Sequence, residues 1–271
     1  MANLAALQAI FEERWPISGA ESWDAPGLVC GSAEQEISRV LLTVDVTSQV
    51  LDEAIAGGFQ LILAHHPFIM RGVNTLDEST GKGALLSKAI RAGVAIYAAH
   101  TNADVVLNGV SHTIALRLGL ENITALDYPG ETVGHGRLGL LPEPISLGEF
   151  ARNLARLLPS TATGVRVAGD YNAMVEKVAL CGGAGDSFIG AAIAAKAHVY
   201  VTSDLRHHVV QDAREQALVG SGAPALIDVS HWASEWLWLE TAAAELRNIV
   251  PNLVFEVSDL RTDPWDFVIT Q

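Results

Sequence analysis

The sequence predicts an α/β protein made of two related lobes, each built on a mainly parallel sheet. Short apolar segments rich in β-branched residues alternate with segments of helical length that are rich in alanine and leucine. Strands that alternate with helices of roughly 10–15 residues are typical of βαβ units, whose parallel sheets are buried on both faces. The second half of the chain also repeats the order of the first half.

In the first half, short apolar strands and helical segments follow one another with few residues between them. We expect strands over 40–46, 60–64 and 94–99, and helices over 48–57, 82–92 and 108–118.

The second half has the same alternation after a shorter, more polar middle. In the middle we expect a strand over 136–141, a helix that starts with a capping box at Ser146 and Glu149, and a strand over 163–168. The second half is expected to form strands over 177–181, 198–202, 225–229 and 254–257, and helices over 186–196, 204–218 and 233–248.

A shift of 138 positions aligns residues 40–66 with 178–204 without a gap. Few residues are identical, but the order strand–helix–strand stays in register. The alignment indicates two related lobes that face each other across a cleft, although any two α/β segments resemble each other to some degree. The predicted organisation is a first lobe over 1–124, a short connecting segment over 125–175 and a second lobe over 176–271.

Composition excludes several classes of protein. The net charge is −14, which opposes binding to a nucleic-acid backbone, although it leaves small phosphorylated ligands open. No apolar stretch is long enough to span a membrane, and the N-terminus lacks the pattern of a secretory signal. Two cysteines are too few for a disulfide framework, which fits the reducing cytoplasm. From net charge, apolar lengths and cysteine count together, we expect a cytoplasmic protein with neither membrane nor nucleic-acid partners.

The first candidate site is the segment His65-His66-Pro67, which follows a predicted strand. Ligand sites of parallel sheets lie at the carboxyl ends of the strands. Because consecutive strand residues point to opposite faces, both imidazoles can serve one site only where the chain leaves the strand, as Pro67 favours. Metal ligation and a structural role are both compatible with this pair.

Two further segments pair a histidine with an acidic residue four positions later. His231 and Glu235 open a predicted helix, where this spacing places both side chains on one face. His100 and Asp104 follow another predicted strand; Asp104 is a candidate ligand, and His100 a candidate ligand, partner of a ligand or proton carrier. Taken alone, the first pair is also compatible with an ordinary solvent-facing helix pair, and the second with a helix-start aspartate beside a structural histidine.

Taken together, these segments predict a centre for two divalent metal ions. Three imidazoles and two carboxylates are too many for one tetrahedral ion but suit two ions about 3.5–4 Å apart. Zinc, iron, manganese, cobalt and nickel all accept such ligands. Metal-bound water ionises near neutral pH, and the resulting hydroxide can act as the nucleophile of a hydrolysis. The predicted ligands are His65, His66, Asp104, His231 and Glu235.

Other polar residues are weaker candidates. Gly183 and Gly185 lie between a predicted strand and helix, where backbone amides can bind phosphate. The segment matches neither the Walker spacing nor the full dinucleotide pattern, which favours a tight structural turn. Asp204 is a second candidate proton carrier and His208 a candidate substrate contact, while His208 and its neighbour also fit a surface pair.

The motifs resemble one known family. WDAPGLVCG (23–31), LILAHHP (61–67), AHTNAD (99–104), GGAGD (182–186), TSD (202–204) and SHWASE (230–235) occur in the order seen in the NIF-three-like family, whose members are often labelled homologues of type 2 GTP cyclohydrolase. The resemblance covers nearly the whole chain. It implies a two-lobed α/β fold, a dinuclear metal centre with Glu235 as the bridging ligand, and assembly into a homohexamer. Ser203 and Ser230 stand where the family usually has glycine, and Ala25 replaces a common asparagine.

The leading hypothesis is a metal-dependent hydrolase that acts on a small phosphorylated or nucleotide-like molecule. The alternative is a non-catalytic metal-binding hexamer with a regulatory or scaffold role. Longer relatives carry an additional domain between the lobes, for which the middle of this chain is too short.

Overall fold

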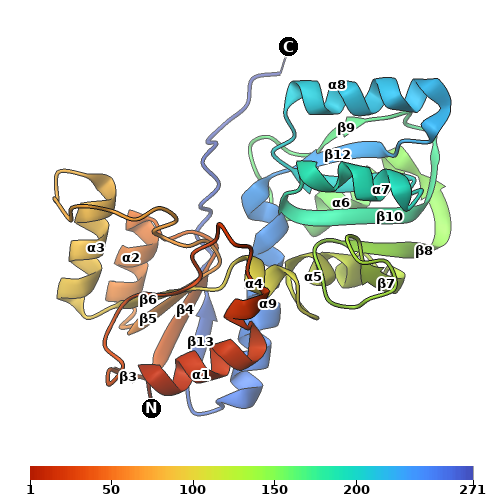
Figure 1. Ribbon diagram of the computed structural model, residues 1–271. Coiled ribbons are helices and arrows are strands. Elements are labelled where there is room, and N and C mark those ends of the chain that lie inside the picture. Colours follow the sequence, from red (N-terminus) through yellow and green to blue (C-terminus); the bar gives the residue numbers. More distant parts are fainter. Residues whose placement is uncertain (271) are drawn as a thin grey trace. The chain divides into compact units, whose positions relative to one another are not determined.

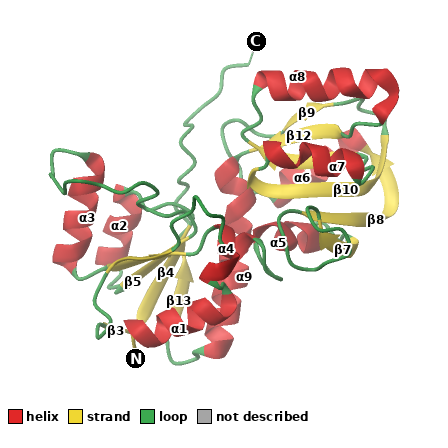
Figure 2. Cartoon of the chain, viewed as in Figure 1, coloured by secondary structure: helices red, strands yellow, loops and turns green. Residues whose placement is uncertain are grey.

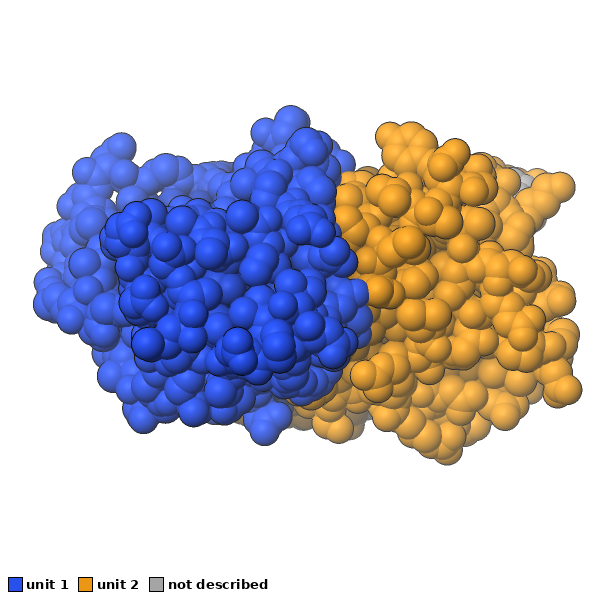
Figure 3. All heavy atoms as spheres, turned by 90° about the horizontal axis from the view of Figure 1, so that it is seen from below, with its two compact units in different colours: residues 1–103, 239–262 blue, residues 104–238, 263–271 orange. Residues whose placement is uncertain are grey.

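A computed structural model of the protein describes residues 1–270, except for the side chains of residues 220 and 221. The chain folds into two compact units, which Figure 3 shows in different colours. Unit 1 contains residues 1–103 and 239–262, and unit 2 contains residues 104–238 and 263–271. The chain therefore passes from one unit to the other three times.

Unit 1 is built on a five-stranded sheet in the order β13-β4-β5-β6-β2 (Figure 1). Its parallel strands are β4 (Arg39–Thr43), β5 (Leu61–Ala64), β6 (Ala95–Ala98) and β13 (Val254–Val257). The edge strand β2 (Gly27–Cys30) is antiparallel to β6. A small antiparallel pair, β1 (Ala2–Asn3) and β3 (Glu36–Ile37), joins the N-terminus to this unit.

Helices cover both faces of this sheet. The helices α2 (Ser48–Ala56) and α3 (Gly81–Ala92) lie side by side on one face (Figure 2). Leu41, Ile62 and Ile96 belong to the buried apolar cluster that includes residues of both helices. On the other face α1 (Leu4–Arg14) buries Phe11 against Tyr97, with ring centroids 4.9 Å apart. Adjacent strand residues supply opposite faces, so the strands are apolar throughout.

Unit 2 is built on a six-stranded sheet in the order β7-β8-β10-β11-β12-β9. The central strands β10 (Met174–Ala184), β11 (Val199–Ser203) and β12 (Ala225–Val229) are parallel. Antiparallel strands extend the sheet on both sides: β7 (Glu121–Ala125), β8 (Arg137–Ser146) and β9 (Arg166–Ala168).

The helices of unit 2 also pack on both faces. Ala179 and Cys181 of β10 belong to the apolar cluster beneath α7 (Ile189–Ala194) and α8 (His207–Gln216). The helices α5 (Val110–Arg117) and α6 (Leu147–Leu157) contact β8 and β10. The predicted cap is confirmed, because the Ser146 hydroxyl accepts a hydrogen bond from the Glu149 amide at 3.2 Å.

The remaining helices are short or belong to both units. The turns Ile17–Gly19 and Asp186–Phe188 are 3₁₀-helical, and α8 continues into a π-helical turn, Ala217–Ser221. The short helix α4 (Thr101–Asp104) and the long helix α9 (His231–Ile249) each contain a boundary between the units.

The two sheets repeat one arrangement, as the shift of 138 positions predicts. The strands β4, β5 and β6 are parallel neighbours with α2 and α3 between them in the chain, and β10, β11 and β12 are parallel neighbours with α7 and α8 between them. In each sheet an antiparallel strand, β2 or β9, closes the same side. The α/β fold class is therefore confirmed.

The boundaries differ from the expected lobes of 1–124 and 176–271. The segment 125–175 supplies β8 and β9 to the sheet of unit 2 rather than connecting two sheets. The segment 239–262 returns to unit 1, because β13 pairs with β4. These pairings join residues far apart in the chain, which a local sequence pattern does not reveal. Among the described residues no helix is long and apolar enough to cross a membrane.

Candidate metal centre

In unit 1, His65 and His66 follow β5 at its carboxyl end. Their amides donate hydrogen bonds to the carbonyls of Thr43 and Val44 at 2.9 Å, which ties the segment to the end of β4. The two ring centroids nevertheless lie only 5.2 Å apart, so the chain has left the regular strand geometry that would separate them. His65 is fully buried.

His100, which follows β6, completes a cluster of three imidazoles. Its ring centroid lies 5.2 Å from that of His65 and 5.4 Å from that of His66. One ligand atom from each ring lies within 4.8 Å of the others, a spacing that a single metal ion can bridge. The structure therefore brings His100 to the two histidines that the sequence singled out.

Each ring of this cluster has its Nδ1 against an acceptor. Nδ1 of His65 lies 2.8 Å from the carbonyl of Ala99, which can only accept a hydrogen bond. Nδ1 of His66 lies 2.7 Å from Asp45, and Nδ1 of His100 lies 2.8 Å from Asp24. All three Nδ1 atoms are therefore protonated donors, which leaves Nε2 of each neutral ring to carry the lone pair.

Asp24 holds His100 in place. Its side chain is shielded from solvent and also accepts hydrogen bonds from the amide and the hydroxyl of Thr101. Burial opposes ionisation of this carboxyl, but the hydrogen bonds from His100 and Thr101 outweigh it and lower the pKa of Asp24 to about 2. The carboxylate is thus charged at neutral pH and fixes the orientation of the ring.

In unit 2, His231 at the start of α9 lies between two carboxylates. Its Nδ1 is 2.6 Å from Asp204 and its Nε2 is 2.9 Å from Glu235, one helical turn further on. Burial alone would lower the pKa of His231, but the charge of Glu235 and the hydrogen bonds to both carboxylates raise it to about 11. Without a metal the ring is an imidazolium, and a metal ion at Nε2 would replace that proton.

Asp204 has this position because of its backbone. It follows β11 and adopts a left-handed conformation, with φ of 57°, which aspartate tolerates better than most residues. The turn directs its carboxylate to Nδ1 of His231, in the same manner as Asp45 and Asp24 toward their histidines. The structure thus gives Asp204 a role in orienting an imidazole.

Asp104 lies in unit 2, where its charge acts on the thiol of Cys181. Burial and then the charge of Asp104 raise the pKa of Cys181 to about 12, and the charge of Glu235 adds to the effect. Both carboxylates therefore act on the same buried thiol. This thiol stays protonated at neutral pH, so Cys181 is not a candidate nucleophile.

Arg137 fixes the chain beside Asp104. Its guanidinium is fully buried and donates hydrogen bonds to the carbonyls of Val105, Val106, Gly134 and Gly136. A buried cation with several carbonyl acceptors is held rigidly, since no acceptor can leave without exposing the charge to an apolar surrounding.

Gly183 and Gly185 both lie where a side chain would meet neighbouring atoms, a packing role that the sequence could not distinguish from phosphate binding. Gly183 has φ of +68°, and a Cβ there would lie 2.5 Å from Oε1 of Glu235. Gly185 accepts a hydrogen bond at its carbonyl from the Tyr200 hydroxyl, and a Cβ there would meet Thr202 at 2.5 Å. The segment after them is a 3₁₀ turn and a helix of six residues.

The serines that depart from the family pattern support the site. Ser230 caps α9, since its hydroxyl accepts from the Ala233 amide at 3.2 Å and donates to Asp263 at 2.6 Å. The hydroxyl of Ser203 lies 3.4 Å from that of Ser234, which accepts from the Gly183 amide. His208 is exposed on α8, with its ring 5.2 Å from that of His207.

Sequence reasoning did not find Asp24 and Asp45. Asp45 follows the carboxyl end of β4. His65 and His66 were found because they follow the carboxyl end of a predicted strand, and the same criterion would have found Asp45. Asp24 lies before an edge strand, 76 residues from His100, and only the antiparallel pairing of β2 with β6 brings them together.

The donor set fits divalent transition metals. Unit 1 by itself supplies three imidazoles with oriented Nε2 atoms. Unit 2 by itself supplies the imidazole of His231 with the carboxylates of Asp204 and Glu235 against it. Neutral imidazole and carboxylate together suit zinc, iron, manganese, cobalt and nickel. The protein can therefore bind a metal ion through these groups.

Comparisons with known proteins agree with this arrangement. A family model described as Duf34/NIF3 (NGG1p interacting factor 3) matches residues 2–264. A protein of Streptomyces coelicolor named "GTP cyclohydrolase 1 type 2 homolog" is 41% identical over 274 residues, covering 98% of this chain and 94% of the relative. A solved structure titled as a Bacillus cereus protein related to NIF3 superposes with a TM-score of 0.90 at 26% identity, covering 98% and 99% of the two chains.

Some relatives are longer than this chain. A protein of Mycobacterium leprae with the same name is 32% identical over an alignment of 375 residues, which covers 98% of this chain and 95% of the relative. Because this chain has 271 residues, that relative contains additional residues within the aligned region.

Proposed function

This chain belongs to the Duf34/NIF3 family, and from that premise we propose that it is a metal-dependent hydrolase of a small phosphorylated or nucleotide-like molecule. In this proposal His65, His66, Asp104, His231 and Glu235 hold two divalent metal ions, with Glu235 as the bridging ligand. The observation that carries it is the uniform orientation of the imidazoles, each with its Nδ1 on an acceptor.

This orientation supports ligation for a physical reason. A histidine held only by packing has no need for the same ring nitrogen to be fixed at every position. Metal-binding histidines commonly donate the other ring nitrogen to a carboxylate or carbonyl, which sets the tautomer and increases the basicity of the ligand. Asp45, Asp204 and the carbonyl of Ala99 supply those acceptors for His66, His231 and His65.

The proposal gives His100 and Asp204 different parts. His100 is adjacent to His65 and His66 and is held by a carboxylate that stays charged, so it can accept a proton at Nε2 during turnover. Asp204 accepts the hydrogen bond of Nδ1 of His231, so its part is to keep that imidazole oriented with Nε2 available to a metal ion.

The bound cations would supply the chemistry of hydrolysis, since a pair of divalent ions lowers the pKa of water and stabilises developing negative charge on a substrate oxygen. The names of the relatives point to a nucleotide-like substrate. Two cations against two carboxylates leave the centre positive, which favours an anionic substrate such as a phosphate ester.

Two further expectations belong to the proposal. The first is assembly of the protein into a homohexamer in the cytoplasm, and the second is that a small phosphorylated molecule, rather than a nucleic acid, is its partner. Light scattering of the purified protein tests the first expectation directly.

The experiment that tests the hydrolase is a substrate panel. Metal-loaded protein, purified without chelators or a histidine tag, is assayed against phosphate esters and nucleotides, and its metals are identified by elemental analysis. We expect turnover in the wild type and its loss in His65→Ala and Glu235→Ala, while the control His198→Ala, which removes an exposed imidazole elsewhere in unit 2, keeps it. Turnover that persists in both site variants, or that no substrate elicits, would leave the metal-binding scaffold as the function.

A further inference from the structure

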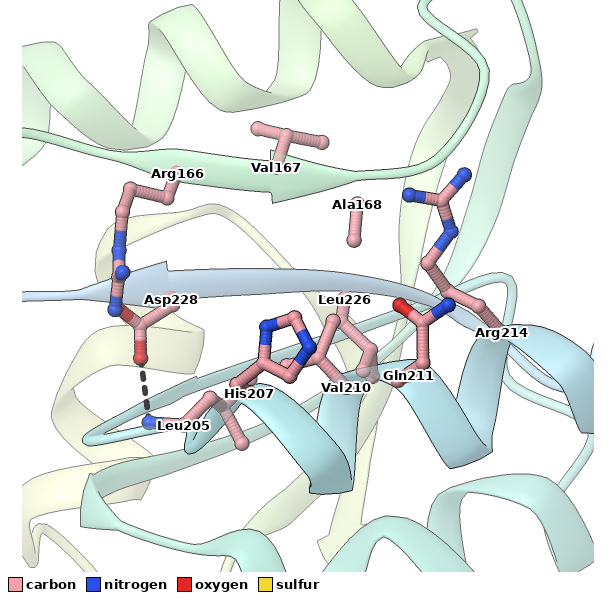
Figure 4. Close-up of a pocket in the computed structure, with 10 residues that line it drawn as sticks. All are labelled: Arg166, Val167, Ala168, Leu205, His207, Val210, Gln211, Arg214, Leu226 and Asp228. Atoms are coloured by element: carbon pink, nitrogen blue, oxygen red, sulfur yellow. Dashed lines mark hydrogen bonds and ion pairs between the residues drawn. The ribbon is translucent and has the colours of Figure 1, made fainter.

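Unit 2 contains a pocket of about 400 Å³ between α8 and the edge of the sheet (Figure 4). Its floor is apolar, formed by the buried side chains of Leu205 and Leu226. Its rim is polar and exposed, formed by Arg166 of β9 and by three residues of α8: His207, Gln211 and Arg214. A volume of this size and a floor of this kind are typical of small-molecule sites.

The polar rim follows from the spacing along α8. His207, Gln211 and Arg214 are separated by four and three positions, which places all three on one face of the helix. Val210 lies on the same face and joins the lining, as Figure 4 shows. One helical face thus supplies an apolar wall with polar groups above it.

The two arginines of the rim differ in their partners. Arg166 forms an ion pair with Asp228, its partner in the β9–β12 register, with Nε of Arg166 2.9 Å from the carboxylate. Among the described residues, the side chains of Arg214 and Gln211 form no hydrogen bond or ion pair. A guanidinium and an amide therefore face the pocket without a protein acceptor, in a chain whose net charge is −14.

We propose that this pocket binds a small organic anion, whose carboxylate or phosphate pairs with Arg214 and whose apolar body lies on Leu205 and Leu226. A guanidinium binds either anion through two parallel hydrogen bonds, and the Gln211 amide adds a third donor one helical turn earlier. A ring or short alkyl group on the apolar floor excludes water from the ion pair and so strengthens it.

The site is separate from the metal ligands but adjacent to them in the chain. The carboxylate of Asp228 that pairs with Arg166 also accepts from the Leu205 amide at 2.8 Å, and Leu205 follows Asp204. The pocket contains none of the predicted metal ligands. The proposal therefore stands or falls independently of the hydrolase.

The experiment is a calorimetric titration of the full-length, metal-loaded protein. The probes are phenylphosphonate and benzoate, which cannot be hydrolysed, and benzyl alcohol as the neutral control. Both anions are expected to bind and benzyl alcohol to bind at least about tenfold more weakly, because it offers Arg214 no charge. The tighter of the two anions identifies the anionic group that the site prefers.

Three variants locate the binding. Arg214→Gln should weaken both anions at least about tenfold, since it removes the charged fork. Arg156→Gln makes the same charge change at an exposed position of α6 and should leave both affinities unchanged. Glu235→Gln alters the proposed metal centre, so it should remove any binding of the anions at that centre and leave unchanged the binding that Arg214→Gln weakens.

Each other outcome overturns the proposal. Equal binding by Arg214→Gln and wild type, or binding lost only in Glu235→Gln, would place the anions elsewhere. Absence of binding at millimolar concentration excludes the site. Affinity that falls as the protein concentration rises would show that a second copy of the chain covers the pocket.

Discussion

Asp24 gives the clearest electrostatic consequence of a single residue. Its pKa of about 2 in the folded protein lies below the ordinary aspartate value of 3.8, so it stabilises the fold at pH values above about 4 and loses that contribution as the pH falls toward 2. We expect Asp24→Asn to lower the free energy of unfolding by about 2 kcal/mol at pH 6. Urea unfolding of both proteins between pH 6 and pH 2 measures the difference.

The difference between the two proteins should shrink as the pH falls from 4 to 2. Asp259→Asn, an exposed aspartate of unit 1, serves as the control and should change the stability little at any pH. A difference for Asp24→Asn that stays constant over the whole range would mean that the residue acts by packing rather than by charge.

Gly183 is the residue whose missing side chain matters most for Glu235. Gly183→Ala would place a methyl group 2.5 Å from Oε1 of Glu235 and force an alanine into φ of +68°. We expect a loss of about 2 kcal/mol in the free energy of unfolding together with reduced metal content, measured by urea unfolding and elemental analysis.

Gly93→Ala is the matched control, because Gly93 has φ of +67° and open space around its Cα. It should lose about 1 kcal/mol, from the backbone alone, and keep its full metal content. If Gly183→Ala retains metal as Gly93→Ala does, close packing against Glu235 is not what holds that carboxylate in place.

At the scale of elements, the buried Arg137 links the loops around Val105 and Gly134 to β8. Arg137→Met fills a similar volume but removes one donor from each of four carbonyls. Those of Val105 and Val106 keep a backbone amide donor, while those of Gly134 and Gly136 lose the guanidinium, so we expect about 3 kcal/mol of destabilisation. Thermal and urea unfolding measure it, with Arg117→Met, at an exposed position near the end of α5, as the control. Equal stability of the two variants would show that the loops are held without the arginine.

The elements also show what the sequence can predict. The strand β12 (Ala225–Val229) has the predicted bounds, and the strands β4, β5, β6 and β11 differ from prediction by a few residues, because continuous apolar runs flanked by glycine or polar residues mark buried parallel strands. The short strands β2 and β7 were not predicted, since they form only through pairing with β6 and β8. The histidines of the site were found for the same reason that β5 and β12 were, because they end a clear apolar run.

At the scale of the whole molecule, bound metal should contribute to the stability of the fold. A ligand that binds only the folded state shifts unfolding by mass action, so removal of metal with a chelator should lower the melting temperature by several degrees. Calorimetry of the protein before and after chelation measures this, with the double variant His65→Ala/Glu235→Ala as a control that should not respond. A wild-type melting temperature unchanged after verified metal loss would contradict a stabilising centre.

The three passages of the chain between the units have a consequence for biosynthesis. The sheet of unit 1 receives its strand β13 from residues 254–257, so that sheet stays incomplete until those residues have left the ribosome. Until then β4 exposes an unpaired edge of strongly apolar sequence. A nascent chain of this protein should therefore depend on chaperones that bind such edges, and truncation before residue 254 should yield aggregates rather than a smaller folded product.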